Sequence, residues 1–369
     1  MNKNRIYRYF IFIFFLFCNY SFAIENTEVE VLNDEEVSKN SNFKKDIFNF
    51  KGFIQTQLYL ENSGKGNIYT ETHEDGLRIR RGRLSAFGQI VESTSYLFQI
   101  NANENHINLE DALIRYQLTN ILSIDAGRFK IPFGIELYEK SEDMLFAERS
   151  RYWSYLFHET KSSGFNFNLT TDYFLWQSGI FYNYTDGYSS VRKQEITNRL
   201  LTKISGFYSG LSFYTNFAQI EGKALDSDIK YNLFFGYQKN NVKIKAEATT
   251  WYLNLNKHKK MAYGSAMSFH YMFFDKWIFS NRFSYLFLEK PEKAIGREIG
   301  QYNMAKGLPA KKSIDLTLSM SYFFFSQSFS VNKKESQNQS KISIDYNPSY
   351  HDSTTLSHAF YLQFQVCFN

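Results

Sequence analysis

Along most of this chain, apolar and polar residues alternate with a period of two, as in a strand whose two faces meet different surroundings. In residues 229–239 one face carries Ile229, Tyr231, Leu233, Phe235 and Tyr237, and the other is mainly polar. Residues 241–254 and 356–368 alternate in the same way. One such strand would also fit a soluble sandwich. A long series of strands of about ten residues is typical of a barrel that crosses a bilayer.

The alternation and the breaks in it predict sixteen strands. They are residues 50–61, 76–90, 94–103, 109–118, 121–129, 162–171, 173–184, 197–207, 209–219, 229–239, 241–254, 262–274, 276–288, 313–327, 339–347 and 356–368. An even number brings both termini to one side of the membrane. We therefore expect an all-β fold, a transmembrane antiparallel β-barrel of about 16 strands.

The gaps between these strands are unequal in length. Gaps after odd-numbered strands are mostly long, and gaps after even-numbered strands mostly short, as expected for external loops and periplasmic turns. Residues 328–338 break this rule, because they form a long gap on the periplasmic side. The longest polar gap in the first half is the third external one, residues 131–161. A long, charged third loop predicts a pore with an internal constriction.

The N-terminal residues differ from the rest of the chain. Residues 1–23 combine a basic start, an apolar stretch and a small residue before the break, which predicts a cleaved secretory signal peptide. Residues 24–46 lack periodicity and are expected to form a periplasmic lead-in, and residues 47–369 the barrel. The signal contains three of the 42 Lys and Arg residues, so the exported chain nearly balances its 37 Asp and Glu. This balance gives no support for nucleic-acid binding, and no cofactor is expected.

Strand parity assigns several arginines to a face. In residues 76–90 it places Arg81 and Arg83 toward the lumen, and in residues 109–118 it does the same for Arg115. Arg78 and Arg80 share the lipid-side parity. An arginine in the middle of the bilayer is costly, so we expect these two above the hydrocarbon, at the external rim or in contact with a loop.

Further cations surround the long gap or lie on a polar face. They are Arg128 and Lys130 at its start, Arg149 and Arg151 within it, and Lys243 and Lys245 in residues 241–254. Fixed cations in a narrow aqueous path attract anions and can hold phosphate. An alternative stays open, in which the loop cations only pair with Glu136, Glu139, Glu142, Asp143 and Glu148 and orient the loop.

Four short motifs add a resemblance to a known family. They are Arg80-Arg81-Gly82-Arg83-Leu84, Leu109-Glu110-Asp111-Ala112 with Tyr116, Gly127-Arg128-Phe129-Lys130-Ile131-Pro132-Phe133-Gly134, and Glu148-Arg149-Ser150. In this order they resemble motifs of the phosphate-selective porins O and P. The resemblance implies a sixteen-stranded, usually trimeric barrel with its third loop folded into the lumen. It implies a constriction at Arg80, Arg81 and Lys130, and a bulge near Gly82 would turn Arg80 toward the pore.

The expected function is that of an outer-membrane porin of a Gram-negative cell, not an enzyme. It would contact outer-membrane lipid and lipopolysaccharide, form a homotrimer, and pass small solutes by diffusion, with a preference for anions such as phosphate or polyphosphate. Arginine is sparse after Arg199, so the sequence indicates anion preference rather than phosphate specificity. Two alternatives stay open: a non-conducting barrel with an adhesion or scaffold role in its external loops, and an outer-membrane hydrolase.

Overall fold

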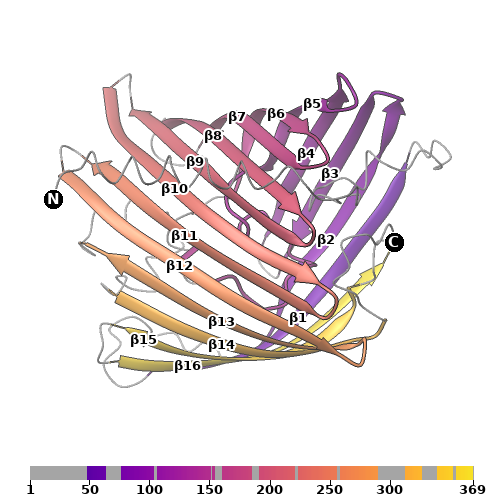
Figure 1. The fold of residues 1–369 in the computed structure, drawn as a ribbon, viewed down its shortest axis with the longest axis vertical. Helices are drawn as coiled ribbons and strands as arrows, with labels where there is room; N and C mark the ends of the chain where they lie inside the picture. Colours follow the sequence, from indigo (N-terminus) through magenta and orange to yellow (C-terminus); the bar gives the residue numbers. More distant parts are fainter. Residues whose placement is uncertain are drawn as a thin grey trace.

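The fold is a single closed sheet of antiparallel strands (Figure 1). A computed structural model describes residues 48–63, 76–103, 106–150, 152–153, 160–184, 191–220, 223–255, 258–289, 312–325, 339–351 and 355–368. Its strands are β1 (Asn49–Ser63), β2 (Gly76–Val91), β3 (Thr94–Ala102), β4 (Ile107–Gln117), β5 (Leu122–Lys130), β6 (Lys161–Thr170), β7 (Phe174–Tyr184), β8 (Val191–Ile204), β9 (Phe207–Ile220), β10 (Lys223–Lys239), β11 (Val242–Leu255), β12 (His258–Phe273), β13 (Trp277–Leu288), β14 (Lys312–Phe323), β15 (Lys341–His351) and β16 (Thr355–Phe368). Each strand pairs with its neighbours in sequence, and β1 closes the barrel against β16.

The sixteen predicted strands are confirmed in number and order across the described residues. The largest errors are at strand starts: β8 begins at Val191 and β10 at Lys223, both six residues earlier than predicted. The predicted periplasmic gap 328–338 lies outside the described residues. The predicted signal peptide and lead-in, residues 1–46, lie outside them as well.

The two faces of the barrel invert the usual arrangement of a soluble protein. In β14, Ser313, Asp315, Thr317, Ser319 and Ser321 are buried on the inner face, while Ile314, Leu316, Leu318 and Met320 are exposed on the outer face. An outward apolar band and a polar interior are what a bilayer requires of a spanning barrel. No helix in the described ranges is long and apolar enough to cross a membrane. Those same ranges contain no His, Cys, Asp and Glu group that could hold a metal ion.

A β-bulge in β2 changes the predicted faces of its first residues. The pairing with β1 joins Gln55 to Arg81 and Thr56 to Ile79, so Arg80 is an extra residue without a partner in register. An extra residue reverses the parity of everything on one side of it. The expectation that Arg78 and Arg80 follow the lipid-side parity is therefore wrong, because the exposed apolar residue on that side is Ile79. The bulge lies at Arg80, close to Gly82, where the family resemblance required one.

The largest apolar cluster of the described residues joins the β5–β6 segment to the inner face of the barrel. It contains Leu113, Phe129, Ile131, Phe133, Leu137, Tyr152, Trp153, Phe181, Tyr214, Trp251, Ala262, Ala266, Leu286 and Leu288. Phe133 packs edge-on against Trp153 and Tyr214, with ring centroids 5.9 and 6.3 Å apart. Two smaller clusters hold Ile135 against β7–β10 and Leu145 against β12–β14. Apolar side chains thus anchor the β5–β6 segment to the barrel wall, and charged residues lie between them in the sequence.

Candidate functional site

The candidate site is the layer where residues 131–150 meet the inward-facing side chains of the barrel. Hydrogen bonds join this segment to strands spread around the sheet: Gln55 of β1 contacts the Ser141 carbonyl, and Asp345 of β15 accepts the Ala147 amide. On the opposite strands, Arg199 of β8 donates to the Gly134 carbonyl oxygen at 3.1 Å. The segment is therefore fixed at several points, because the inner face supplies partners for its backbone.

Glu247 of β11 organises the turn that begins the segment. Its carboxylate accepts the amides of Ile135 and Glu136 at 3.0 and 3.2 Å, and the indole N–H of Trp153 at 2.7 Å. Gly134 precedes these amides with a φ of 62°, a left-handed conformation that favours glycine. One buried carboxylate thus satisfies three donors of the segment, which fixes the direction in which the chain leaves the barrel wall.

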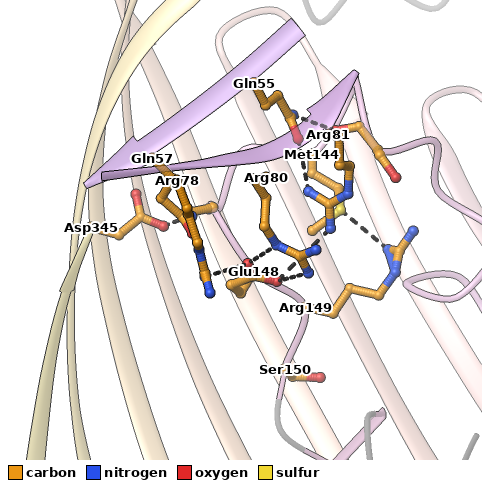
Figure 2. Close-up of polar contacts among 12 residues, drawn as sticks. Gln55, Gln57, Arg78, Arg80, Arg81, Met144, Glu148, Arg149, Ser150 and Asp345 are labelled. Carbon is orange, nitrogen blue, oxygen red and sulfur yellow. Dashed lines mark hydrogen bonds and ion pairs between the residues drawn. The ribbon is translucent and has the colours of Figure 1, made fainter. Parts of the chain in front are cut away.

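Three arginines of β2 converge on one carboxylate, that of Glu148 (Figure 2). Arg80 makes a bidentate contact, from Nε to Oε1 at 2.5 Å and from Nη2 to Oε2 at 2.9 Å. Arg78 and Arg81 approach the same carboxylate at 3.5 and 3.9 Å. We call these three arginines the β2 cluster. The bulge makes the cluster possible, since it brings adjacent residues 80 and 81 to one carboxylate.

A second group of cations lies on β11, and we call Lys243 and Lys245 the β11 pair. Both ammonium groups contact the carboxylate of Glu139, Lys243 at 3.7 Å and Lys245 at hydrogen-bond distance. On β13, Arg282 contacts Glu136 Oε1 at 3.1 Å. Among the described residues, three of the five loop acids considered therefore pair with cations of the barrel wall, whereas the alternative paired them with cations of the loop.

Lys130 and Arg149 differ from the other candidates in their described contacts, which are to neutral acceptors. Lys130 Nζ donates to the Glu139 carbonyl oxygen at 2.7 Å and approaches that of Tyr138 at 3.5 Å. Arg149 donates to the carbonyl oxygens of Glu136 and Glu139, each at 2.7 Å, and contacts Met144 Sδ at 3.3 Å. Carbonyl oxygens fix these two cations in place without cancelling their charge.

The described contacts of the remaining predicted cations are to the barrel wall rather than to residues 131–150. Arg83 contacts Glu110 at 3.6 Å and Arg115 contacts Asp125 at 2.6 Å, so both are paired within the barrel wall. Arg128 donates to the Leu109 carbonyl at 3.4 Å. In register it lies opposite the exposed Ser163, on the outward side of β5. Arg151 lies outside the described residues.

The sequence analysis missed the wall residues that hold the segment, among them the charged residues Arg199, Glu247, Arg282 and Lys341. Lys341 of β15 donates to the Met144 carbonyl oxygen, and Arg282 donates to that of Glu148 at 3.0 Å. Their inward parity was readable from the alternation of β8, β11, β13 and β15. Nothing in the local sequence gave their partners, because each contact joins positions more than sixty residues apart.

The loop carboxyl groups have unequal acidities. Burial by itself raises the pKa of Glu139, but the ammonium groups of Lys245 and Lys243 lower that pKa to about 2. Burial opposes ionisation of Glu148 too, yet the guanidinium groups of Arg80, Arg81 and Arg78 hold its pKa well below the usual range. For Asp143, burial and the neighbouring Glu142 raise the pKa to about 6. Near neutral pH, Asp143 is therefore the loop acid closest to a change of charge.

Comparison with known families supports the motif assignment. The model of the family described as phosphate-selective porin O and P matches residues 63–203, which include β2, β5 and the candidate-site segment between β5 and β6. The resemblance suggested by the four motifs, which lie within residues 77–150, is therefore confirmed for this stretch. No curated protein sequence matches the chain.

Three solved structures with the same fold are distant in sequence. An anion-selective porin from Comamonas acidovorans is similar with a TM-score of 0.63 and 9% identity, over 87% of this chain and 99% of that one. The outer membrane channel DcaP of Acinetobacter baumannii has a TM-score of 0.58 and 10% identity, over 87% and 97%. OmpT, an outer membrane protein of Vibrio cholerae, has a TM-score of 0.56 and 11% identity, over 87% and 97%. At such identities the likeness shows a shared outer-membrane barrel fold.

Proposed function

We propose that this protein is an outer-membrane porin, a water-filled channel through which small solutes diffuse passively with a preference for anions. The observation that carries the proposal is the closed barrel with an apolar outer face and a charged inner face, into which residues 131–150 bring further charges. The family match over residues 63–203 supports the same function. A channel needs no catalytic group, and the fold and family point to transport rather than catalysis.

The anion preference is inferred from the balance of charges at the candidate site. Three guanidinium groups of the β2 cluster share one carboxylate. The described contacts of Lys130 and Arg149 are to carbonyl oxygens rather than to carboxylates. Excess fixed cations in a narrow aqueous path lower the energy of a passing anion and raise that of a cation. Inorganic phosphate and related oxyanions are the solutes that such arginines would bind best.

The setting of the channel is part of the proposal. Residues 1–23 would direct export and be removed, and residues 131–160 would form the third external loop and narrow the lumen. The exposed apolar residues of the strands would contact outer-membrane lipid, with lipopolysaccharide on the external side. A homotrimer is the proposed assembly, and one of the similar OmpT structures is described as a trimer form.

The test is electrical recording from the purified protein in planar lipid bilayers. We expect discrete conductance steps and, in a potassium chloride gradient, a reversal potential of the sign set by chloride permeation. Adding phosphate should reduce the chloride current if both anions share the path. Absence of conductance steps would leave only a non-conducting barrel, and a reversal potential of the opposite sign would remove the anion preference alone.

A further inference from the structure

The carboxylate of Glu148 lies where a bound oxyanion would lie. Arg80 meets its two oxygens through Nε and Nη2, at 2.5 and 2.9 Å (Figure 2). Such a parallel, two-bond contact is the geometry in which a guanidinium group recognises a carboxylate or a phosphate. The chain thus places one of its own carboxylates in a position suited to an anion.

Two of the three arginines have contacts that orient them independently of Glu148. Arg78 donates to Gln57 Oε1 at 2.9 Å from Nε and 2.5 Å from Nη2, and Arg81 donates to Gln55 Oε1 at 2.8 Å. Both acceptors are neutral side chains on β1, so they orient the arginines without cancelling their charge. Arg78 and Arg81 would therefore keep their orientation if the carboxylate left.

The backbone around Glu148 is also held independently of its side chain. The Ala147 amide donates to Asp345 at 2.7 Å, and Arg282 donates to the Glu148 carbonyl oxygen at 3.0 Å. Ser150 donates from its hydroxyl to Glu136 at 2.5 Å. The Glu148 side chain can therefore turn away by rotation of its own bonds, without release of the segment.

The site of Glu148 is accessible to a solute in the lumen, and its net charge favours an anion. The side chains of Glu148 and Arg80 are 26% and 31% exposed, so a solute in the lumen can reach both. One negative charge faces three positive charges. A phosphate dianion would match this excess better than the single carboxylate does, because attraction grows with the product of the charges.

We propose that Glu148 is an internal occupant of the anion site formed by Arg78, Arg80 and Arg81, and that a passing oxyanion of the phosphate class competes with it. Glu148 then lowers the affinity of the site, which shortens the residence of the anion and keeps the channel conducting. This inference rests on the proposed function. It adds an acidic residue, Glu148, that lowers the affinity of the arginine site for oxyanions.

The decisive variant is Glu148→Gln, which removes the competing charge but keeps the size of the side chain. The measurement is the concentration of inorganic phosphate that halves the chloride current in planar bilayers. We expect this concentration to fall about tenfold or more, which corresponds to about 1.4 kcal/mol. The control is Asp228→Asn, which removes another inner-face carboxylate that is bound to one cation, Lys230, at 2.8 Å. The control should keep the wild-type value.

An unchanged or higher half-blocking concentration in Glu148→Gln would overturn the inference while the wild-type conductance still supports the porin. An equal fall in Asp228→Asn would also overturn it, since the effect would then report net charge alone.

A second measurement uses the wild-type protein and does not depend on the variant folding or on conduction. The carboxylate stretching bands of isotope-labelled glutamate are followed by difference infrared spectroscopy of the detergent-solubilised barrel, with and without inorganic phosphate. Displacement of Glu148 from its two-bond contact with Arg80 should shift a carboxylate band, while hydrogen exchange at Ala147, whose amide is bound to Asp345, stays unchanged. An unchanged carboxylate spectrum at saturating phosphate would contradict the competition.

Discussion

The β2 cluster and the β11 pair both bind one acid of the same segment, yet they do so differently. On β2, three guanidinium groups share Glu148, and one of them forms two parallel bonds. On β11, two ammonium groups share Glu139 through single contacts. Guanidinium groups are planar and weakly hydrated, whereas an ammonium group is a compact, strongly hydrated point charge.

This difference indicates which strand recognises anions and which strand only holds residues 131–150 in place. The β2 cluster keeps the larger excess of positive charge, three guanidinium groups to one carboxylate, in a planar geometry that suits an oxyanion. The β11 pair keeps a smaller excess, two ammonium groups to one carboxylate, and an ammonium group lacks that planar geometry. We therefore assign anion recognition mainly to β2 and attachment of residues 131–150 to β11.

The largest effect on this comparison is expected from Glu247→Gln. This substitution should loosen residues 131–150, which contact both β2 and β11. The amide has only one oxygen, so at least one of the donors Ile135, Glu136 and Trp153 loses its acceptor. Each buried donor without an acceptor costs about 1–3 kcal/mol. We expect faster trypsin cleavage within residues 131–150 and a larger single-channel conductance. Both clusters would lose their loop acids together.

The matched control for that variant is Glu195→Gln. Glu195 is also buried on the inner face, but its side-chain donors, Ser162 and Tyr214, belong to barrel strands. Cleavage of residues 131–150 should stay at the wild-type rate. If both variants accelerate cleavage equally, Glu247 has no particular role in holding the segment.

Arg80→Ala breaks the β2 cluster alone. It removes both short contacts to Glu148 and leaves that acid with Arg78 and Arg81 at 3.5 and 3.9 Å. Loss of a hydrogen bond to a charged group is worth about 1.5–3 kcal/mol, so we expect the anion-to-cation permeability ratio to fall about tenfold. Reversal potentials in a salt gradient measure it. Lys239→Ala, which removes an exposed cation at the end of β10, should leave the ratio unchanged.

Lys245→Ala breaks the β11 pair and should have a smaller effect. Lys243 stays near Glu139 at 3.7 Å and compensates part of the exposed negative charge. We expect the permeability ratio to fall about two- to fivefold, in line with single ion pairs worth about 1 kcal/mol or less. The same reversal-potential measurement tests it. A loss as large as that of Arg80→Ala would erase the distinction between the two strands.

A pH titration sharpens the comparison with the smallest expected change. Asp143 has a raised pKa of about 6, so it loses its negative charge as the pH falls from 7.5 to 5. Glu139, with a pKa of about 2, stays charged, and so does Glu148. The anion preference should therefore rise at pH 5, by less than about twofold for one partly screened charge. Asp143→Asn should abolish this pH dependence, and a variant that retains it would assign the titration elsewhere.

The raised pKa of Asp143 also makes the free energy of unfolding depend on pH in a defined direction. Between pH 6 and the ordinary Asp pKa near 4, folded Asp143 holds a proton that the unfolded chain does not. This group therefore makes the free energy of unfolding larger as the pH falls through about 6, and smaller as the pH rises. Denaturant titrations of wild type and Asp143→Asn at pH 5 and pH 7.5 would measure the difference.

The alternation of residues was enough to predict sixteen strands, their order and most inward-facing residues. Period-two patterns are local. In each strand, lipid on one side requires apolar residues, and water or protein on the other side accepts polar ones. Arg115 and Arg81 lie inward as parity predicts. Arg78 and Arg80 do not follow parity, because the bulge at Arg80 exists only in the register between β1 and β2.

The sequence alone therefore determined the barrel, the position of its long charged segment and the residues of the family motifs. Tertiary structure decided which acid meets which cation: Glu148 meets β2, Glu139 meets β11, and Lys130 and Arg149 meet carbonyl oxygens. These pairings depend on closure of the sheet and on apolar anchors such as Phe133 and Trp153. They join positions far apart in the chain, and no local pattern of residues carries that information.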